Sequence, residues 1–309
     1  MVSRAQGCLL GQLAGDALGS LVEFRSPDDI RLEYPFGVHE LADGGTWNTI
    51  AGQPTDDSEM ALMLARTLVE KRRYDADQAR QAYVFWLNSG PFDVGDTVRR
   101  GLHGQRIFGS QANGAMMRIS PLGIFGANYE LPQVAEWARQ DANLTHPNPV
   151  CLQANALFAM AIAHAIATGP GPQELYRQIE SWAREMNPQA ELLKSITDAS
   201  MAPPSDYVHQ QGWVLTAFGN ALWQLLHAPN LADGVIDTAM RGGDTDTNAA
   251  ITGALLGAVY GREAVPLQWI EKLLSCRPEA GQPHILRPRP KCFWPVDAME
   301  LAEQLVARG

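Results

Sequence analysis

The chain has 309 residues, of which 46% are hydrophobic and 19% are charged, so it can bury a sizeable core and is not a disordered chain. Its 24 Lys and Arg residues face 34 Asp and Glu residues, and the resulting formal charge of −10 argues against broad binding to nucleic acid, which needs a basic face. The four cysteines form no CxxC pair and the first residues lack a signal-peptide pattern, so we expect a reduced, cytoplasmic protein.

Apolar residues recur at three- and four-residue spacing along the chain, which predicts a series of helices. The expected helices lie at residues 8–18, 60–69, 79–87, 150–166, 215–226, 249–259, 267–274 and 298–306. Gly11 and Gly15 share one side of the first helix, which indicates a close-packed face. Alternating β-branched runs are few. The sequence therefore predicts an all-α fold in one compact domain over residues 1–309.

Segments rich in glycine and proline separate these helices. We expect loops at residues 27–54, 90–113 and 168–172, and a proline-rich connector at about 278–295 before a C-terminal helix. Long loops inside a compact domain are often functional. The basic run Arg287–Lys291 in the connector is predicted to be solvated. The apolar stretch 154–168 is too short to span a bilayer, so we expect no membrane partner. We also expect a monomer.

Two acidic clusters each precede an apolar helical run. One reads PTDDS at residues 54–58 and the other reads RGGDTDTN at residues 241–248. Helix capping explains one acid in each cluster, because acids favour the positive end of a helix. It does not require two acids in each. Four converging carboxylates would repel one another unless a cation lay between them, and oxygen ligands suit Mg²⁺ or Mn²⁺.

A calcium EF-hand is a further candidate for the second cluster, because Asp244-x-Asp246-x-Asn248 matches its opening. The EF-hand loop needs glycine at its sixth position and glutamate at its twelfth. Ala249 and Leu255 occupy those positions, so this candidate fails.

A third acidic feature, Asp16 with Glu23, lies at the first predicted helix. The two residues are seven apart and would face the same way if the helix continued, although we expect Gly19 to end it. Taken singly, each acid could equally be a solvated surface residue.

Together, several motifs resemble the ADP-ribosylglycohydrolase family, in family order from residue 7 to about 261. They are Gly7–Gly11, Gly15–Gly19 with Glu23, Thr55–Asp57, Asn113–Arg118, Thr145–His146 and Gly242–Thr247. The loop Pro91–Thr97 is most similar to that of the bacterial dinitrogenase-reductase-activating glycohydrolases. The resemblance implies an all-α fold with two divalent cations, Mg²⁺ or Mn²⁺, in a cleft. It also implies hydrolytic removal of ADP-ribose from a protein side chain, with arginine favoured by the Pro91–Thr97 loop.

The resemblance also implies the roles of individual residues. The ligands of one cation would be Thr55, Asp56 and Asp57; those of the other would be Glu23, Asp244 and Thr247, with Asp246 as the bridge between them. Asp16 would be structural. The catalytic candidates are Asp57, Asp246 and the loop residue Asp93, which would act as a base or contact the ribose ring. Taken alone, Asp93 could be a solvent-facing turn residue. An anionic site suits this chemistry, because glycosidic bonds break through an oxocarbenium-like state.

Residues that would hold the nucleotide are assigned on weaker patterns. Small residues in the loop 109–114 allow backbone N–H groups to approach a diphosphate, although an ordinary flexible loop has the same composition. The candidates are Gly109, Ser110, Gln111, Asn113 and Gly114, with Ala112 standing where the family often has glycine. His146 resembles the family histidine near the diphosphate, and Trp213 takes the place of a tyrosine near the adenosine. An aromatic residue at helical spacing can also be part of the core.

These patterns leave several functions open. The leading hypothesis is an enzyme acting on an ADP-ribosylated protein and releasing ADP-ribose. The alternatives are a hydrolase of serine-linked or small-molecule ADP-ribosyl substrates, a non-catalytic ADP-ribose-binding protein, and a structural protein with acidic helix caps.

Overall fold

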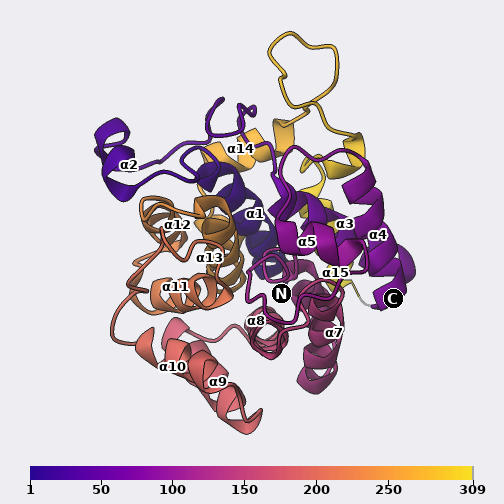
Figure 1. The fold of residues 1–309 in the computed structure, drawn as a ribbon, viewed down its shortest axis with the longest axis vertical. Helices are drawn as coiled ribbons and strands as arrows, with labels where there is room; N and C mark the ends of the chain where they lie inside the picture. Colours follow the sequence, from indigo (N-terminus) through magenta and orange to yellow (C-terminus); the bar gives the residue numbers. More distant parts are fainter. Residues whose placement is uncertain (308–309) are drawn as a thin grey trace.

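Two helices, α1 (Val2–Gly19) and α13 (Thr245–Tyr260), pack against each other along their length at the centre of the protein (Figure 1). The computed structural model describes residues 1–307. A Cβ atom added to Gly11 would lie 2.2 Å from the carbonyl oxygen of Gly253, and one added to Gly15 would lie 2.1 Å from that of Ala249. Only a hydrogen atom fits at these positions. The close-packed face predicted from Gly11 and Gly15 is therefore where α13 lies.

The all-α prediction is confirmed, because within residues 1–307 the only β pairing is two isolated bridges, Gly44 with Thr49 and Ala112 with Trp213. The other helices of the first half are α2 (Pro27–Glu33), α3 (Asp56–Lys71), α4 (Ala76–Asn88), α5 (Asp96–Leu102), α6 (Ser120–Gly126), α7 (Leu131–Asn143) and α8 (Pro149–Thr168). Those of the second half are α9 (Pro172–Glu185), α10 (Ala190–Asp198), α11 (Val214–His227), α12 (Leu231–Ala239), α14 (Leu267–Ser275) and α15 (Ala298–Val306), with short 3₁₀ turns η1 (Arg262–Ala264) and η2 (Lys291–Phe293).

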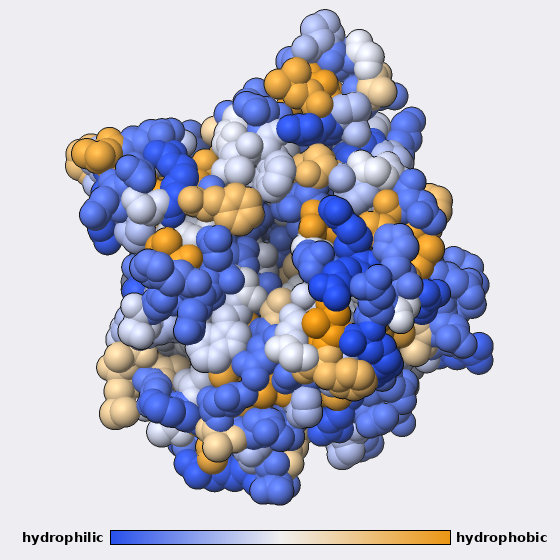
Figure 2. Space-filling model, in the orientation of Figure 1, coloured by the Kyte–Doolittle hydropathy of each residue, from blue (hydrophilic) through white to orange (hydrophobic). Residues whose placement is uncertain are grey.

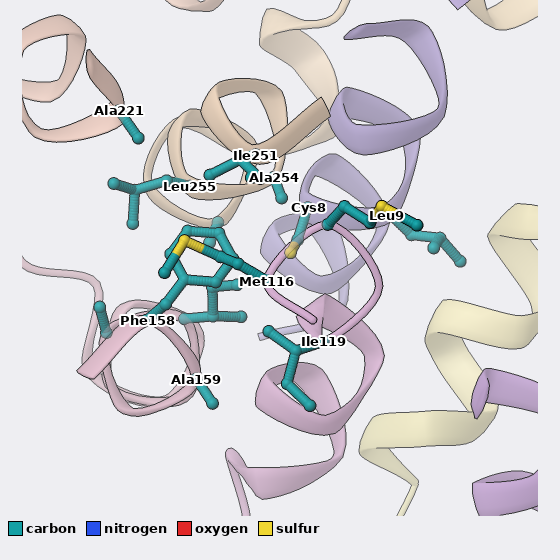
Figure 3. Packing of buried hydrophobic residues seen from close by; sticks show 14 of the residues in the cluster. Cys8, Leu9, Met116, Ile119, Phe158, Ala159, Ala221, Ile251, Ala254 and Leu255 are labelled. Atoms are coloured by element: carbon teal, nitrogen blue, oxygen red, sulfur yellow. The ribbon is translucent and has the colours of Figure 1, made fainter. Parts of the chain in front are cut away.

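The hydrophobic core fills the space between α1, α8, α11 and α13. Cys8 of α1, Phe158 of α8 and Leu255 of α13 converge there without exposure to solvent (Figure 3). Phe158 meets Phe218 of α11 edge to face, with 6.3 Å between ring centroids. Edge-to-face contact is a favoured geometry for buried aromatic rings.

Helix α8 starts five residues earlier than the apolar stretch 154–168 considered in the sequence. With 20 residues it is long and apolar enough to cross a bilayer by length and composition alone, which corrects the expectation that the segment is too short. Of its most apolar window, 78% is buried inside the protein. Such burial is typical of the core helix of a globular protein.

The helices that periodicity missed are α2, α5, α6, α7, α9, α10 and α12. The segments 27–54 and 90–113, predicted as loops, contain α2 and α5, which have seven residues each. Seven residues form too few turns to show a clear period. Helix α9 buries Leu175, Ile179 and Trp182, and this four- and three-residue spacing was a readable signal. The predicted loop 168–172 is confirmed, since Gly169 ends α8 in the left-handed conformation and Pro172 opens α9.

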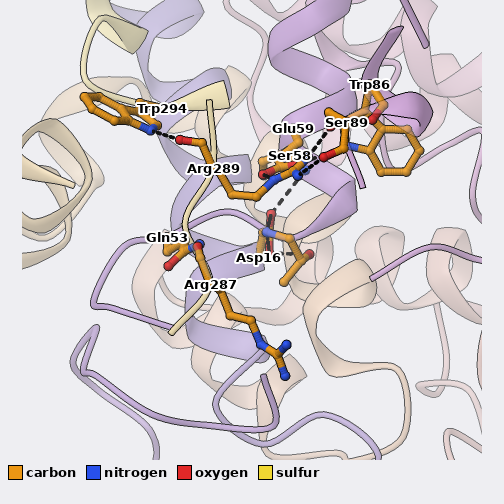
Figure 4. Close-up of polar contacts among 10 residues, drawn as sticks. Asp16, Gln53, Ser58, Glu59, Trp86, Ser89, Arg287, Arg289 and Trp294 are labelled. Atoms are coloured by element: carbon orange, nitrogen blue, oxygen red, sulfur yellow. Dashed lines mark hydrogen bonds and ion pairs between the residues drawn. The ribbon is translucent and has the colours of Figure 1, made fainter. Parts of the chain in front are cut away.

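The connector 278–295 differs from its prediction most clearly at Arg289. Arg289 is only 7% exposed, and its Nη2 and Nε atoms donate to the carboxylate of Glu59 at 2.7 and 2.8 Å (Figure 4). Arg289 Nη2 also donates to Ser89, and Trp86 donates its indole N–H to Glu59. The prediction of a wholly solvated basic run is therefore wrong at Arg289, which forms a buried ion pair with α3.

Candidate active site and metal centre

The C-terminal end of α1 meets the N-terminal end of α13, and this contact brings the acidic residues together. Helix α1 ends at Gly19, as predicted, and a Cβ atom there would lie 2.4 Å from the Cα atom of Asp246. The hydroxyl of Thr245 donates to the carbonyl oxygen of Gly19 at 2.7 Å. The turn after Gly19 then carries Glu23 back beside the start of α13, where the backbone N–H of Phe24 donates to Gly243 at 2.7 Å.

Five carboxylates form two groups that share one member. One group consists of Asp16, Asp57 and Asp246, and the other consists of Glu23, Asp93 and Asp246; within each, ligand oxygens lie within 4.8 Å of one another. Asp246 thus occupies the position that a bridging ligand would need. Among residues 1–307, the other two predicted acidic ligands, Asp56 and Asp244, line the adjoining cleft outside both groups.

Asp16, predicted to be structural, caps helix α3 from a distance of 39 residues. Its carboxylate accepts hydrogen bonds from the backbone N–H groups of Thr55 and Ser58 and from the Thr55 hydroxyl, at 2.8–3.2 Å. The side chains of Thr55 and Asp244, at the N-cap positions of α3 and α13, make no capping hydrogen bond. The expectation that the two acidic clusters also cap their own helices is therefore wrong at these positions. The Thr55 hydroxyl donates to Asp16 instead, and the Asp244 carboxylate accepts from the side chain of Asn113.

Among residues 1–307, no lysine, arginine or histidine forms an ion pair with Asp16, Glu23, Asp57 or Asp246. Burial, followed by repulsion from Asp93 and Asp244, raises the pKa of Glu23 to about 9. Burial also raises the pKa of Asp16 to about 6, and burial with neighbouring carboxylates holds the pKa values of Asp57 and Asp246 well above the usual range. A bound cation would favour the charged carboxylates and so lower these pKa values.

The surroundings of Asp57 show most directly how well the site fits a cation. Its Oδ2 atom accepts from the hydroxyls of Thr55 at 3.2 Å and Thr247 at 3.4 Å, while its buried Oδ1 atom has no hydrogen-bond partner. A buried oxygen without a partner costs free energy. The surrounding donors are carboxylate and hydroxyl oxygens, and this set fits a hard cation such as Mg²⁺ or Mn²⁺.

A cleft of about 280 Å³ opens above these groups, and the face of the molecule is hollowed near its centre (Figure 2). The predicted site residues that line it are Glu23, Asp56, Asp93, Asn113, Gly114, His146, Asp244, Asp246 and Thr247. Thr55 and Asp57 are buried beside it. Asn113 donates its amide N–H to Asp244 at 2.7 Å, so it holds one of the acids in place.

The segment 111–114 is fixed to residues 212–214 by backbone pairing. Asn113 donates to the carbonyl oxygen of Gly212 and Val214 donates to that of Gln111, both at 2.9 Å. Trp213 donates its indole N–H to the side chain of Gln111 at 2.7 Å. Gln111 and Trp213 line a second hollow of about 360 Å³ that shares Ala112, Gln211 and Gly212 with the cleft. In the described structure Gly109 and Ser110 line neither hollow.

His146 is fully buried at the cleft wall, and its two ring nitrogens have different surroundings. Nδ1 lies 2.7 Å from the hydroxyl of Thr145, while Nε2 is buried without a partner. Burial, together with the charge of Arg118, lowers the pKa of His146 to about 3, so the ring is neutral near pH 7. A neutral ring that accepts from Thr145 at Nδ1 has its remaining N–H at Nε2, ready to donate into the cleft.

Two aromatic residues at the site escaped the sequence analysis. Trp47 donates its indole N–H to Glu23 at 2.6 Å, and Phe24 lines the cleft beside Glu23. Phe24 follows a predicted ligand directly, and this adjacency could have identified it. Trp47 lies in a long loop with no local pattern, and its contact depends on how that loop folds back.

The fold and the site define an all-α protein with a buried carboxylate centre at the floor of a cleft. The family model of the ADP-ribosylglycohydrolases matches residues 1–307, and the chain belongs to this family. Family membership supports hydrolase activity on ADP-ribosyl substrates.

Similar proteins cover nearly the whole chain. A Rhodospirillum rubrum protein named ADP-ribosyl-[dinitrogen reductase] glycohydrolase is 30% identical over 280 residues, covering 87% of this chain and 90% of that protein. ADP-ribosylarginine hydrolase Tri1 of Pseudomonas putida is 28% identical over 289 residues, covering 88% of this chain and 74% of that protein. A solved structure described as an ADP-ribosylglycohydrolase-related protein complex has a TM-score of 0.78 at 25% identity and covers 99% of this chain and 97% of its own.

Proposed function

We propose that this protein is a metal-dependent hydrolase that removes ADP-ribose from a modified arginine side chain of a protein. The proposal rests on the two clusters of three carboxylates that share Asp246 at the floor of the cleft. The arginine linkage is supported by the name of the Tri1 relative and by the resemblance of the loop around Asp93.

Two cations, Mg²⁺ or Mn²⁺, would be held by side-chain oxygens at the N-terminal ends of α3 and α13 and by Glu23 in the turn after α1. The proposed ligands are Thr55, Asp56 and Asp57 for one cation and Glu23, Asp244 and Thr247 for the other, with Asp246 shared. When bound, such cations supply positive charge that orients the ribose hydroxyls and activates a water molecule.

Asp93 is the proposed base or partner of the ribose ring. It lines the cleft and belongs to the same group as Glu23 and Asp246. Burial, followed by repulsion from Asp244, raises the pKa of Asp93 to about 7. A carboxyl group with a pKa near the working pH can both accept and return a proton. Its negative form also stabilises positive charge at the anomeric carbon as the glycosidic bond breaks.

The diphosphate and the adenosine would lie along the other wall of the cleft. His146 can donate from Nε2 to a phosphate oxygen, and the backbone of Asn113 and Gly114 borders the same space. Trp213 offers a half-buried ring at the neighbouring hollow, where a base could stack. We keep Gly109, Ser110 and Gln111 as proposed contacts of the nucleotide.

The test is release of free ADP-ribose from a protein modified on arginine, with Mg²⁺ or Mn²⁺ added. We expect release that depends on the metal. The Asp93→Asn variant should lose about a hundredfold or more in rate, which is the usual contribution of a positioned acid or base. Asp77→Asn, an exposed acid in the first turn of α4, is the matched control and should retain full activity.

Two other outcomes would contradict the proposal in different ways. No release with either metal, while a serine-linked or small-molecule substrate is hydrolysed, would refute the arginine linkage. Calorimetric binding of ADP-ribose without hydrolysis of any of these substrates would identify a binding protein instead.

We also propose that the enzyme acts as a monomer in the cytoplasm, without membrane attachment. Support for a reducing compartment comes from the free thiols of Cys8, Cys151, Cys276 and Cys292. Light scattering on the purified protein should give the mass of a single chain, and a dimer mass would contradict the monomer.

A further inference from the structure

Three aromatic rings contact one another in a row that begins at the cleft. Phe24 meets Trp47 edge to face at 6.4 Å between ring centroids, and Trp47 meets Phe92 at 5.9 Å. We call Phe24, Trp47 and Phe92 the aromatic rim. Phe24 itself lines the cleft together with Glu23 and Asp93, so one ring of the rim shares the cleft with the carboxylates.

Phe24 is held in an unfavourable position. Its φ of +63° lies in the left-handed region, which is rare for a bulky residue, and its side chain is 55% exposed. The backbone N–H of Phe24 donates to Gly243 at 2.7 Å, and the N–H of Gly243 donates to Arg25 at 3.1 Å. This pairing fixes the backbone of Phe24 beside the residues that precede α13. Local strain of this kind is concentrated at functional sites, and here it keeps an apolar ring exposed at the cleft.

The chain already places one guanidinium group on the rim. The Arg287 guanidinium carbon lies 5.9 Å from the centroid of the Phe92 ring, and Arg287 Nε donates to the carbonyl oxygen of Trp47 at 2.9 Å. A cation over an aromatic face at this distance is attracted to the ring. The rim is therefore compatible in shape and chemistry with a planar cation.

The charge around the cleft favours a cation as well. Among the described residues that line it there is no lysine or arginine, while Asp93 and Asp96 line it together with Phe24. A guanidinium group is planar, delocalised and weakly hydrated, so it both stacks on rings and pairs with carboxylates.

We infer that the aromatic rim, above all Phe24, is the subsite for the guanidinium group of the modified arginine. This inference rests on the proposed function, because it names the residues that would distinguish an arginine linkage from a linkage to a serine hydroxyl. The ribose lies over the carboxylates, and the side chain that leaves passes between Phe24 and Asp93.

The experiment compares Phe24→Leu and Phe92→Leu with the control Phe85→Leu. Leucine keeps the apolar character but removes the ring. Phe85 on α4 is also 55% exposed, but it contacts the ring of Phe293 and no ring of the aromatic rim. Two quantities are measured: kcat/KM for arginine-linked ADP-ribose and the inhibition constant of free ADP-ribose. We expect Phe24→Leu to lower kcat/KM about threefold to thirtyfold, as for loss of one cation–π contact, without changing inhibition by ADP-ribose.

The other results overturn the inference. If the wild-type enzyme hydrolyses the arginine linkage and Phe24→Leu matches it, the guanidinium subsite is wrong while the proposed function stands. If Phe24→Leu weakens inhibition by ADP-ribose as much as it lowers kcat/KM, the ring contacts the nucleotide instead. If the wild-type enzyme does not act on the arginine linkage at all, both proposals fail. Phe92 does not have a positive φ, so Phe92→Leu removes a ring of the rim without touching the strained position of Phe24. A lower kcat/KM in both variants therefore reports loss of the rim and not misfolding at Phe24.

Discussion

The first turns of helix α3 bury three carboxylates, and two of them, Asp57 and Glu59, are two residues apart and have different partners. Glu59 receives two hydrogen bonds from Arg289 and one from the indole of Trp86 (Figure 4). The side chain of Asp57 accepts hydrogen bonds only from the hydroxyls of Thr55 at 3.2 Å and Thr247 at 3.4 Å, and its Oδ1 atom has no hydrogen-bond partner.

The comparison distinguishes a buried carboxylate that is paired with an arginine from one that has no ion pair among residues 1–307. A buried carboxylate is tolerated when the chain supplies a cation, as Arg289 does for Glu59. If the group around Asp57 and Asp246 binds its cation from solution, as we propose, its stability and activity should depend on metal. The predictions below test this contrast.

The largest effect is expected from Asp246→Asn. This change removes the carboxylate shared by both groups, so we expect metal binding to be lost and activity to fall about a thousandfold or more, which corresponds to several kcal/mol of transition-state stabilisation. Rates of ADP-ribose release would be measured beside Asp77→Asn. Near-normal activity of Asp246→Asn at saturating Mn²⁺ would show that this residue does not bridge the ions.

Glu59→Gln should affect stability with or without metal. The change leaves the guanidinium of Arg289 buried without its counter-charge, which typically costs about 3–5 kcal/mol. Urea unfolding would be followed with and without a chelator, with the exposed Glu70→Gln as control. A loss below about 1 kcal/mol, or a loss that appears only when metal is bound, would remove the distinction between the two carboxylates.

The metal-free protein should lose stability as pH rises. Burial above all raises the pKa of Asp16 from 3.8 to about 6, of Asp93 from 3.8 to about 7 and of Glu23 from 4.5 to about 9. The folded state therefore binds protons more tightly than the unfolded state, and stability present near pH 4 is lost progressively up to about pH 9. Thermal unfolding in a chelator would show this decline, and Mn²⁺ should reduce it. A melting temperature that stays constant or rises across this range in chelator would contradict the account.

The sequence was informative where a pattern is local. The spacing of apolar residues located the long helices, and the glycines of α1 marked the face that meets α13. The two acidic clusters were recognised as a possible shared centre because each carries more acid than a helix cap needs. The structure brings Asp57 and Asp246 within one group of ligand oxygens, which agrees with that interpretation.

The sequence failed where a contact joins distant segments. Asp16 caps α3 across 39 residues, and Arg289 pairs with Glu59 across 230 residues. Local composition predicts a solvated Arg289 and a cap of α3 from its own acidic cluster, since it carries no information about which chain segment folds back onto α3. The same reason hid Trp47 as the partner of Glu23.

The most direct test of the account is the number of Mn²⁺ ions bound per chain, measured by equilibrium dialysis at neutral pH on wild-type protein and on Asp246→Asn. The account predicts two ions on the wild-type chain and loss of binding in the variant, with Asp77→Asn unchanged. A wild-type chain that binds neither Mn²⁺ nor Mg²⁺, or a variant that still binds two ions, would contradict it.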